Sequence, residues 1–171
     1  MTPLPAALAR SPDLIAWRLD WARHAASWNT GEGARTEGGR WNSPGQRAVY
    51  CSLDPATTIL ERAVHTGFAM LDTVAHVLTS VRIEEPISVQ VVSPEDVPNA
   101  NWLRSGFPSA GQQSFGDALL ASNLFVVIPS VVSSRSWNLI FDPVRAEGAY
   151  TLVMQEPFAL DARLHRPVKT P

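Results

Sequence analysis

The pattern of hydrophobic and polar positions predicts short strands separated by polar turns. Residues 15–19 alternate, with Trp17 and Leu19 on one side and Ala16 and Arg18 on the other. Residues 124–128 (LFVVI) are continuously apolar and rich in β-branched side chains, which predicts a buried strand. Further strands are predicted over residues 48–52, 74–83, 87–92, 137–141 and 150–154.

A helix is predicted directly after the strand that ends near residue 52. Asp54 is a favourable N-cap, Pro55 occupies the first helical position, and Gly67 marks the stop. Glu61 lies at the side of an apolar face, with His65 one turn further on. At ~100° per residue, that face comprises Ala56, Ile59, Leu60, Ala63 and Val64.

A second helix is predicted over residues 112–122, capped by Ser109 and weakened by Gly116. Residues 94–108 have no clear period and are expected to be irregular. Many strands with two or three helices favour an α+β fold over an alternating βαβ arrangement. No linker divides the chain, so we expect one domain over residues 1–171.

Residues 29–46 form a long, polar and glycine-rich stretch that is expected to be a loop. Loops of this length inside a compact domain are usually functional or disordered. Arg40 and Trp41 lie in its middle, where a simple connector would gain little from either side chain.

Composition narrows the classes of function. The formal net charge is −2 and Lys169 is the only lysine, which argues against a broad nucleic-acid surface. Arginine supplies most of the positive charge, and its planar fork suits small anions. Cys51 is the only cysteine, which excludes an internal disulfide. With no signal-peptide pattern and no apolar run of membrane-spanning length, we expect a cytoplasmic protein without membrane contact.

Common catalytic motifs are absent or incomplete. The glycines at 31, 33 and 38 depart from the dinucleotide-binding spacing. Glu61 and His65 could share a metal ion, but no further ligands have suitable spacing, so no metal site is predicted. No cluster of Ser, His and Asp indicates a serine hydrolase.

Five polar residues stand at unusual positions, although each has an ordinary explanation when taken alone. Arg18 could be the outward residue of an alternating strand, and Arg40 a solvated loop charge. Tyr50 could belong to the core, Glu61 to the helix surface and Ser130 to a turn.

Taken together, these residues lie within motifs that resemble the RES domain family, named for its Arg, Glu and Ser. The resemblance covers about residues 15–154. The sequence departs from the family pattern at two places: Asp142 stands where Asn is expected, and the usual histidine after Pro143 is absent. The matching pieces are Trp17-Arg18, GGRWNSPG (38–45), AVY (48–50), ILERAVH (59–65), FGDALL (115–120), IPSVV (128–132) and NLIFDP (138–143).

The resemblance implies an ADP-ribosyltransferase-like fold, with a central, mostly antiparallel sheet flanked by helices. It also implies a toxin of an Xre–RES toxin–antitoxin pair that uses NAD⁺ as its substrate. Such a toxin cleaves the nicotinamide–ribose bond, which depletes NAD⁺ or transfers ADP-ribose to a protein, and growth stops. The implied partners are a helix-turn-helix antitoxin of the Xre type, a possible protein acceptor, and a second toxin copy within the complex.

The chemistry of the five residues agrees with this implication. Arg18 and Arg40 can grip a pyrophosphate through bidentate hydrogen bonds. Tyr50 can stack on the cationic nicotinamide ring, while Trp41 serves as a wall of the site or an anchor of the loop. We therefore predict that Arg18, Arg40, Tyr50, Trp41 and Ser130 bind NAD⁺.

Glu61 is the predicted catalytic carboxylate, because a carboxylate stabilises the oxocarbenium-like charge that develops on the ribose. Nicotinamide leaves as a neutral molecule without protonation, so a second carboxyl group is not required. Ser130 would orient either Glu61 or the nicotinamide amide. The predicted catalytic residues are Glu61, Arg40 and Ser130.

Two other classes of function stay open at this stage. A nucleic-acid-directed toxin such as a ribonuclease is disfavoured by the negative net charge of the chain and by the lack of a histidine pair. A non-catalytic module that binds an antitoxin through exposed apolar residues is the other alternative.

Overall fold

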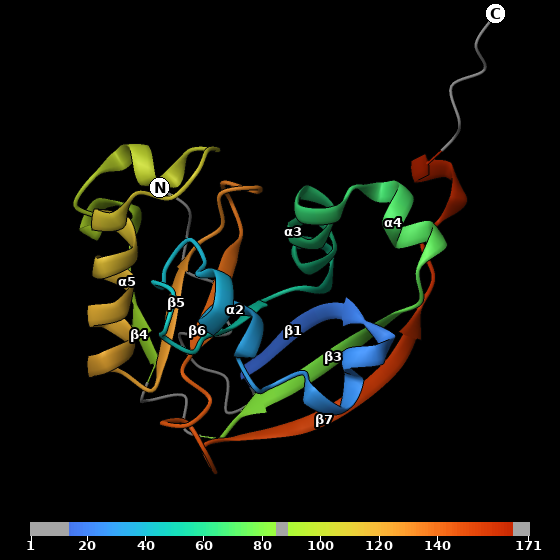
Figure 1. The fold of residues 1–171 in the computed structure, drawn as a ribbon, viewed down its shortest axis with the longest axis horizontal. Coiled ribbons are helices and arrows are strands. Elements are labelled where there is room, and N and C mark those ends of the chain that lie inside the picture. Colours follow the sequence, from blue (N-terminus) through green and yellow to red (C-terminus); the bar gives the residue numbers. More distant parts are fainter. Residues whose placement is uncertain (1–13, 85–88, 166–171) are drawn as a thin grey trace, which may run out of the picture.

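A seven-stranded sheet organises the chain in the computed structural model, which describes residues 14–84 and 89–165 (Figure 1). The strand order is β4-β5-β6-β2-β1-β3-β7, and β4 pairs with β5 in parallel. The other strand pairs are antiparallel. The strands are β1 (Leu14–Trp21), β2 (Val49–Ser52), β3 (His76–Ile83), β4 (Val89–Val91), β5 (Phe125–Pro129), β6 (Trp137–Phe141) and β7 (Tyr150–Phe158).

Helices flank this sheet, which confirms the expected α+β fold with a mostly antiparallel sheet. Figure 1 shows α5 beside β4 and β5, whereas α3 and α4 lie over the part of the sheet that contains β1 and β3. None of the helices in the described ranges is long and apolar enough to cross a membrane. The helices are α2 (Glu32–Glu37), α3 (Pro55–Thr66), α4 (Phe68–Thr73) and α5 (Ala110–Ser122), with 3-10 turns η1 (Ala22–Ser27), η3 (Pro94–Asp96), η4 (Ala100–Leu103) and η5 (Ala162–His165).

Helix α3 begins and ends where the sequence predicts. The Asp54 carboxylate accepts a hydrogen bond from the Thr57 amide at 2.8 Å, and Gly67 ends the helix with a φ of 78°. The apolar face is less buried than its pattern suggests, because Leu60 is 42% and Val64 67% exposed. The helix instead contacts the sheet through buried Ala63, which packs in a cluster with Leu19 and Leu78, and through buried Thr58, whose hydroxyl donates to the Trp17 carbonyl oxygen at 3.0 Å.

The expectation of a continuous loop over residues 29–46 is wrong in part, because α2 lies within it. Its glycines act mainly at the ends of this helix. Gly31 precedes it with a φ of 64°, and Gly38 follows it with a φ of 75°. Helix α4 was not predicted, and β7 runs four residues beyond the predicted strand. Of the strand predicted at 87–92, residues 87 and 88 lie outside the described residues.

Helix α5 confirms the Ser109 cap, whose hydroxyl accepts a hydrogen bond from the Gln112 amide at 3.2 Å. Gly116 has a structural purpose that its low helix propensity hides. A β-carbon at this position would lie 2.1 Å from the carbonyl oxygen of Trp41. Glycine therefore lets the loop backbone pack directly against α5, which positions the segment that carries Arg40.

Candidate active site

Glu61 is held by two side chains, one directly after β5 and the other on the neighbouring strand β6. Its Oε1 accepts a hydrogen bond from the Ser130 hydroxyl at 2.8 Å and another from the Asn138 amide at 2.6 Å. Ser130 directly follows β5, Asn138 lies on β6, and Glu61 lies on α3. Within the described residues, Oε2 receives no hydrogen bond. The structure thus fixes one carboxylate oxygen, while the other has no donor among residues 14–84 and 89–165.

A second set of hydrogen bonds orients these two donors. The Ser52 hydroxyl donates to Asn138 Oδ1 at 2.8 Å, which turns the amide nitrogen toward Glu61. Ser52 and Asn138 are direct cross-strand partners of β2 and β6. The Ser133 amide donates to Ser130 Oγ at 3.2 Å. The sequence analysis assigned no role to Ser52 or Asn138. Asn138 begins the matching piece NLIFDP, whereas the signal at Ser52 was only a polar residue at the end of an otherwise apolar strand.

Tyr50 connects the sheet to the loop through its hydroxyl group. The hydroxyl accepts a hydrogen bond from the Trp41 amide at 3.0 Å and donates to Asn42 Oδ1 at 2.7 Å. Burial raises the pKa of Tyr50 far above its usual value, so the phenol is protonated at neutral pH. Gly39 allows this approach, because a β-carbon there would lie 2.6 Å from the Tyr50 oxygen.

The Trp41 side chain lies in the core rather than on an open surface. It is 2% exposed, and its ring packs edge-on against Phe115 with the centroids 6.3 Å apart. Asn42, also buried, donates to the carbonyl oxygens of Ala34 and Gln46 at 2.9 and 3.0 Å. These contacts fix the loop on both sides of the turn that begins at Gly39.

Arg40 extends from this fixed loop toward the segment before α5. Its guanidinium donates to the carbonyl oxygen of Gly106 at 2.9 Å and more weakly to those of Trp102 and Arg104, at 3.4 Å each. Burial lowers the pKa of Arg40, while the nearby Glu61 and Tyr50 side chains raise it. An arginine stays cationic under such shifts, so Arg40 provides a positive charge near the Glu61 carboxylate.

Arg18 reaches the same region from β1. One terminal nitrogen donates to the Tyr50 carbonyl oxygen at 3.0 Å, and the other binds Asp20 at 2.5 Å. Asp20 also faces Arg62 at 3.7 Å. Burial alone would raise the pKa of Asp20, but Arg18, the Trp21 amide and Arg62 together lower it. Asp20 and Arg62 extend the group around Arg18, and the sequence analysis did not identify them.

The predicted residues therefore form one connected group. Tyr50 bonds to the loop that carries Arg40, and Arg18 bonds to the Tyr50 backbone. Glu61 and Ser130 bond to each other, and the Glu61 carboxylate interacts electrostatically with Arg40. The group combines a fixed carboxylate, two cations and a half-buried aromatic ring.

Comparison with known proteins assigns the family. The RES domain family model matches residues 15–161. The chain belongs to the RES domain family. This confirms the resemblance that the sequence motifs indicated, over slightly more of the chain than they covered.

RES relatives and one solved structure match most of the chain. Toxin Res of Yersinia enterocolitica is 31% identical over 156 residues, which cover 88% of this chain and 99% of that protein. The Prs ADP-ribosylating toxin of a Sphingobium species is 28% identical, covering 77% and 83%. The crystal structure of the MbcT–MbcA toxin–antitoxin complex of M. tuberculosis contains a similar fold, with a TM-score of 0.61 and 20% identity over 86% of this chain and 85% of that chain.

The departure from the RES pattern at Asp142 is accommodated by local hydrogen bonds. Its carboxylate accepts from the Gln46 side chain and from the Val144 amide, both at 2.9 Å. Its carbonyl oxygen accepts from the Ala146 amide at 3.0 Å. Asp142 therefore ties the end of the 29–46 segment to the turn after β6.

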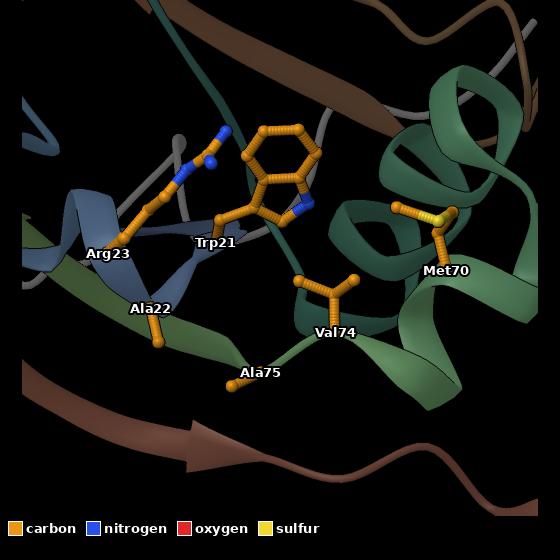
Figure 2. A pocket seen from close by; sticks show the side chains of 6 residues that line it. All are labelled: Trp21, Ala22, Arg23, Met70, Val74 and Ala75. Atoms are coloured by element: carbon orange, nitrogen blue, oxygen red, sulfur yellow. The ribbon is translucent and has the colours of Figure 1, made fainter.

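Cavities also lie outside this group of residues, among them two in the part of the chain that the structure describes. One, of about 300 Å³, lies between the end of β1 and α4 and is lined by Trp21, Arg23, Met70 and Val74 (Figure 2). The other, of about 360 Å³, lies beside Asn29 and Tyr150. In the described ranges, no three His, Cys, Asp or Glu side chains are grouped closely enough to hold a metal ion.

Proposed function

We propose that this RES domain binds NAD⁺ and cleaves its nicotinamide–ribose bond. The observation that carries this proposal is the Glu61 carboxylate, which Ser130 and Asn138 hold at Oε1 while Oε2 has no donor from the described residues. A carboxylate fixed in this way stabilises positive charge on the ribose without reorganising during the reaction. Oε2 is the oxygen that faces the ribose in this proposal.

The remaining residues have complementary roles in the proposal. Arg40 and Arg18 bind the pyrophosphate, which competes with the carbonyl oxygens that each arginine contacts in the absence of substrate. The Arg40 contacts to Trp102 and Arg104 are 3.4 Å long and therefore weak, so exchange for a phosphate is favourable. The Tyr50 ring stacks on the nicotinamide, while its hydroxyl remains bonded to the loop.

The relatives support a role in a toxin–antitoxin pair. One is named an ADP-ribosylating toxin, and another is named a Res toxin. We infer that this protein is a toxin restrained by a cognate antitoxin, for which a helix-turn-helix protein of the Xre type is the expected partner. ADP-ribose passes to water, to phosphate or to a protein acceptor, and loss of NAD⁺ or modification of the acceptor stops growth.

Release of nicotinamide from NAD⁺ tests the proposal directly. Purified protein is incubated with NAD⁺, with and without phosphate and a bacterial lysate as the acceptor source, and nicotinamide is followed by chromatography. We expect release by the wild type and a loss of at least 100-fold in Glu61→Gln, which keeps the shape but removes the charge. Glu95→Gln, an exposed substitution of the same kind, is the matched control and is expected to be fully active. Absence of release by the wild type under every condition would refute the proposal.

A further inference from the structure

We infer that Asn138 is a positioning residue for Glu61, and that Ser52 sets the orientation of its amide. This inference rests on the proposed function of Glu61. Neither residue is one of the Arg, Glu and Ser residues for which the family is named. Both lie on central strands of the sheet and therefore provide a rigid support for a carboxylate on the adjoining helix.

The hydrogen bonds around Glu61 have a fixed direction. Asn138 could present either its oxygen or its nitrogen to the carboxylate, and only the nitrogen can donate. The Ser52 hydroxyl resolves this choice by donating to Oδ1 at 2.8 Å, so that Nδ2 faces Glu61 Oε1 at 2.6 Å. Ser52 is 3% exposed, which shields this hydrogen bond from water.

Ser130 is oriented toward the same oxygen by a parallel arrangement. Its Oγ accepts a hydrogen bond from the Ser133 amide, so the single hydroxyl hydrogen is free to donate to Glu61. Two donors therefore converge on Oε1 from β6 and from the turn after β5. Their combined effect is to fix the orientation of the carboxylate, while Oε2 has no donor from the described residues.

Asn138→Asp provides the sharpest test, because it places a second carboxyl group where the amide nitrogen now donates. Two carboxylates at this distance cannot both be ionised, so they share a proton and the acidic limb of kcat moves to higher pH. We expect a shift of more than one pH unit. The carbon-13 signal of the Glu61 carboxyl should show the same shift in a titration that needs no turnover.

Removal of single donors tests the positioning role by rate. Asn138→Ala is expected to lower kcat about 10- to 100-fold, which is the range for losing one hydrogen bond to a charged group. Ser52→Ala is expected to lower kcat less, because the amide can still donate in one of its two orientations. Asn101→Asp makes the same chemical change as Asn138→Asp at an exposed site, and should leave the pH profile unchanged.

The outcomes separate this inference from the proposed function. If the wild type releases no nicotinamide, the function and the inference that rests on it both fail. If the wild type is active, but folded Asn138→Asp keeps the wild-type acidic limb and carboxyl titration, only the role of Asn138 is refuted. Thermal melts establish that each variant is folded, and should Asn138→Asp not fold, an unchanged kcat in Ser52→Ala and Asn138→Ala gives the same refutation.

Discussion

Gly116→Ala has two opposing effects on the free energy of unfolding, and the structure predicts which one dominates. In an ordinary helix interior the change would stabilise the protein by up to ~1 kcal/mol, because alanine has the higher helix propensity. At Gly116 the added β-carbon would lie 2.1 Å from the Trp41 carbonyl oxygen and 2.5 Å from its carbon, well inside the 3.4 Å at which ordinary contact begins. These are backbone atoms of a buried residue, so no side-chain rotation relieves the overlap.

Overpacking of this kind costs roughly 1–3 kcal/mol or more, and here the whole loop must move away from α5. We expect a net loss of about 2 kcal/mol in the free energy of unfolding, or a fall in Tm of roughly 4–8 °C for a domain of this size. Urea and thermal denaturation measure both. The control is Gly111→Ala in the first turn of the same helix, where the nearest side-chain atom would be at an ordinary 3.5 Å. Equal or higher stability of Gly116→Ala would refute the argument.

Two further predictions concern buried polar contacts. Tyr50→Phe leaves the Trp41 amide and Asn42 Oδ1 without their shared partner. It should therefore lower the free energy of unfolding, measured by urea denaturation, by about 1–3 kcal/mol. A loss below ~0.5 kcal/mol would contradict the role of the hydroxyl. The lowered pKa of Asp20 means that its pairing stabilises the fold above the ordinary aspartate pKa of ~3.9 and that this contribution disappears as the pH falls below it. Arg18→Leu should therefore show a shallower loss of stability than the wild type between about pH 5 and pH 3, and identical slopes would contradict this assignment.

Local signals explain the elements that the sequence predicted well. Asp54, Pro55 and Gly67 act on backbone groups within a few residues of themselves, so they specify the ends of α3 without help from the rest of the fold. The strand at 137–141 was predicted with its observed bounds because Trp137, Ile140 and Phe141 are aromatic or β-branched, which favours a strand. The family motifs then indicated which polar residues to propose for the site.

The missed features depend on contacts between distant segments. From the sequence, Gly116 only weakened the predicted helix. In the structure it allows the close approach of Trp41, which is 75 positions away in the chain. Ser52 and Asn138 become a pair only through the register of β2 and β6, which no short-range pattern reveals. Helix α2 was overlooked because the glycines around it predict a loop, whereas they lie mainly at its ends.

The segment around Arg40 combines two kinds of residue whose replacement should have separable effects. Trp41 and Asn42 are buried and bonded within the protein, so their replacement should reduce stability and, through the displaced loop, substrate binding as well. Arg40 is half-buried, and its hydrogen bonds within the described part of the chain go to carbonyl oxygens of a neighbouring segment, two of them at weak distances. Arg40→Ala should accordingly weaken NAD⁺ binding, measured by calorimetry, while the Tm stays within a few degrees of the wild-type value. A large fall in Tm would instead make Arg40 a structural clamp between the loop and residues 102–106, and its role in phosphate binding would have to be abandoned.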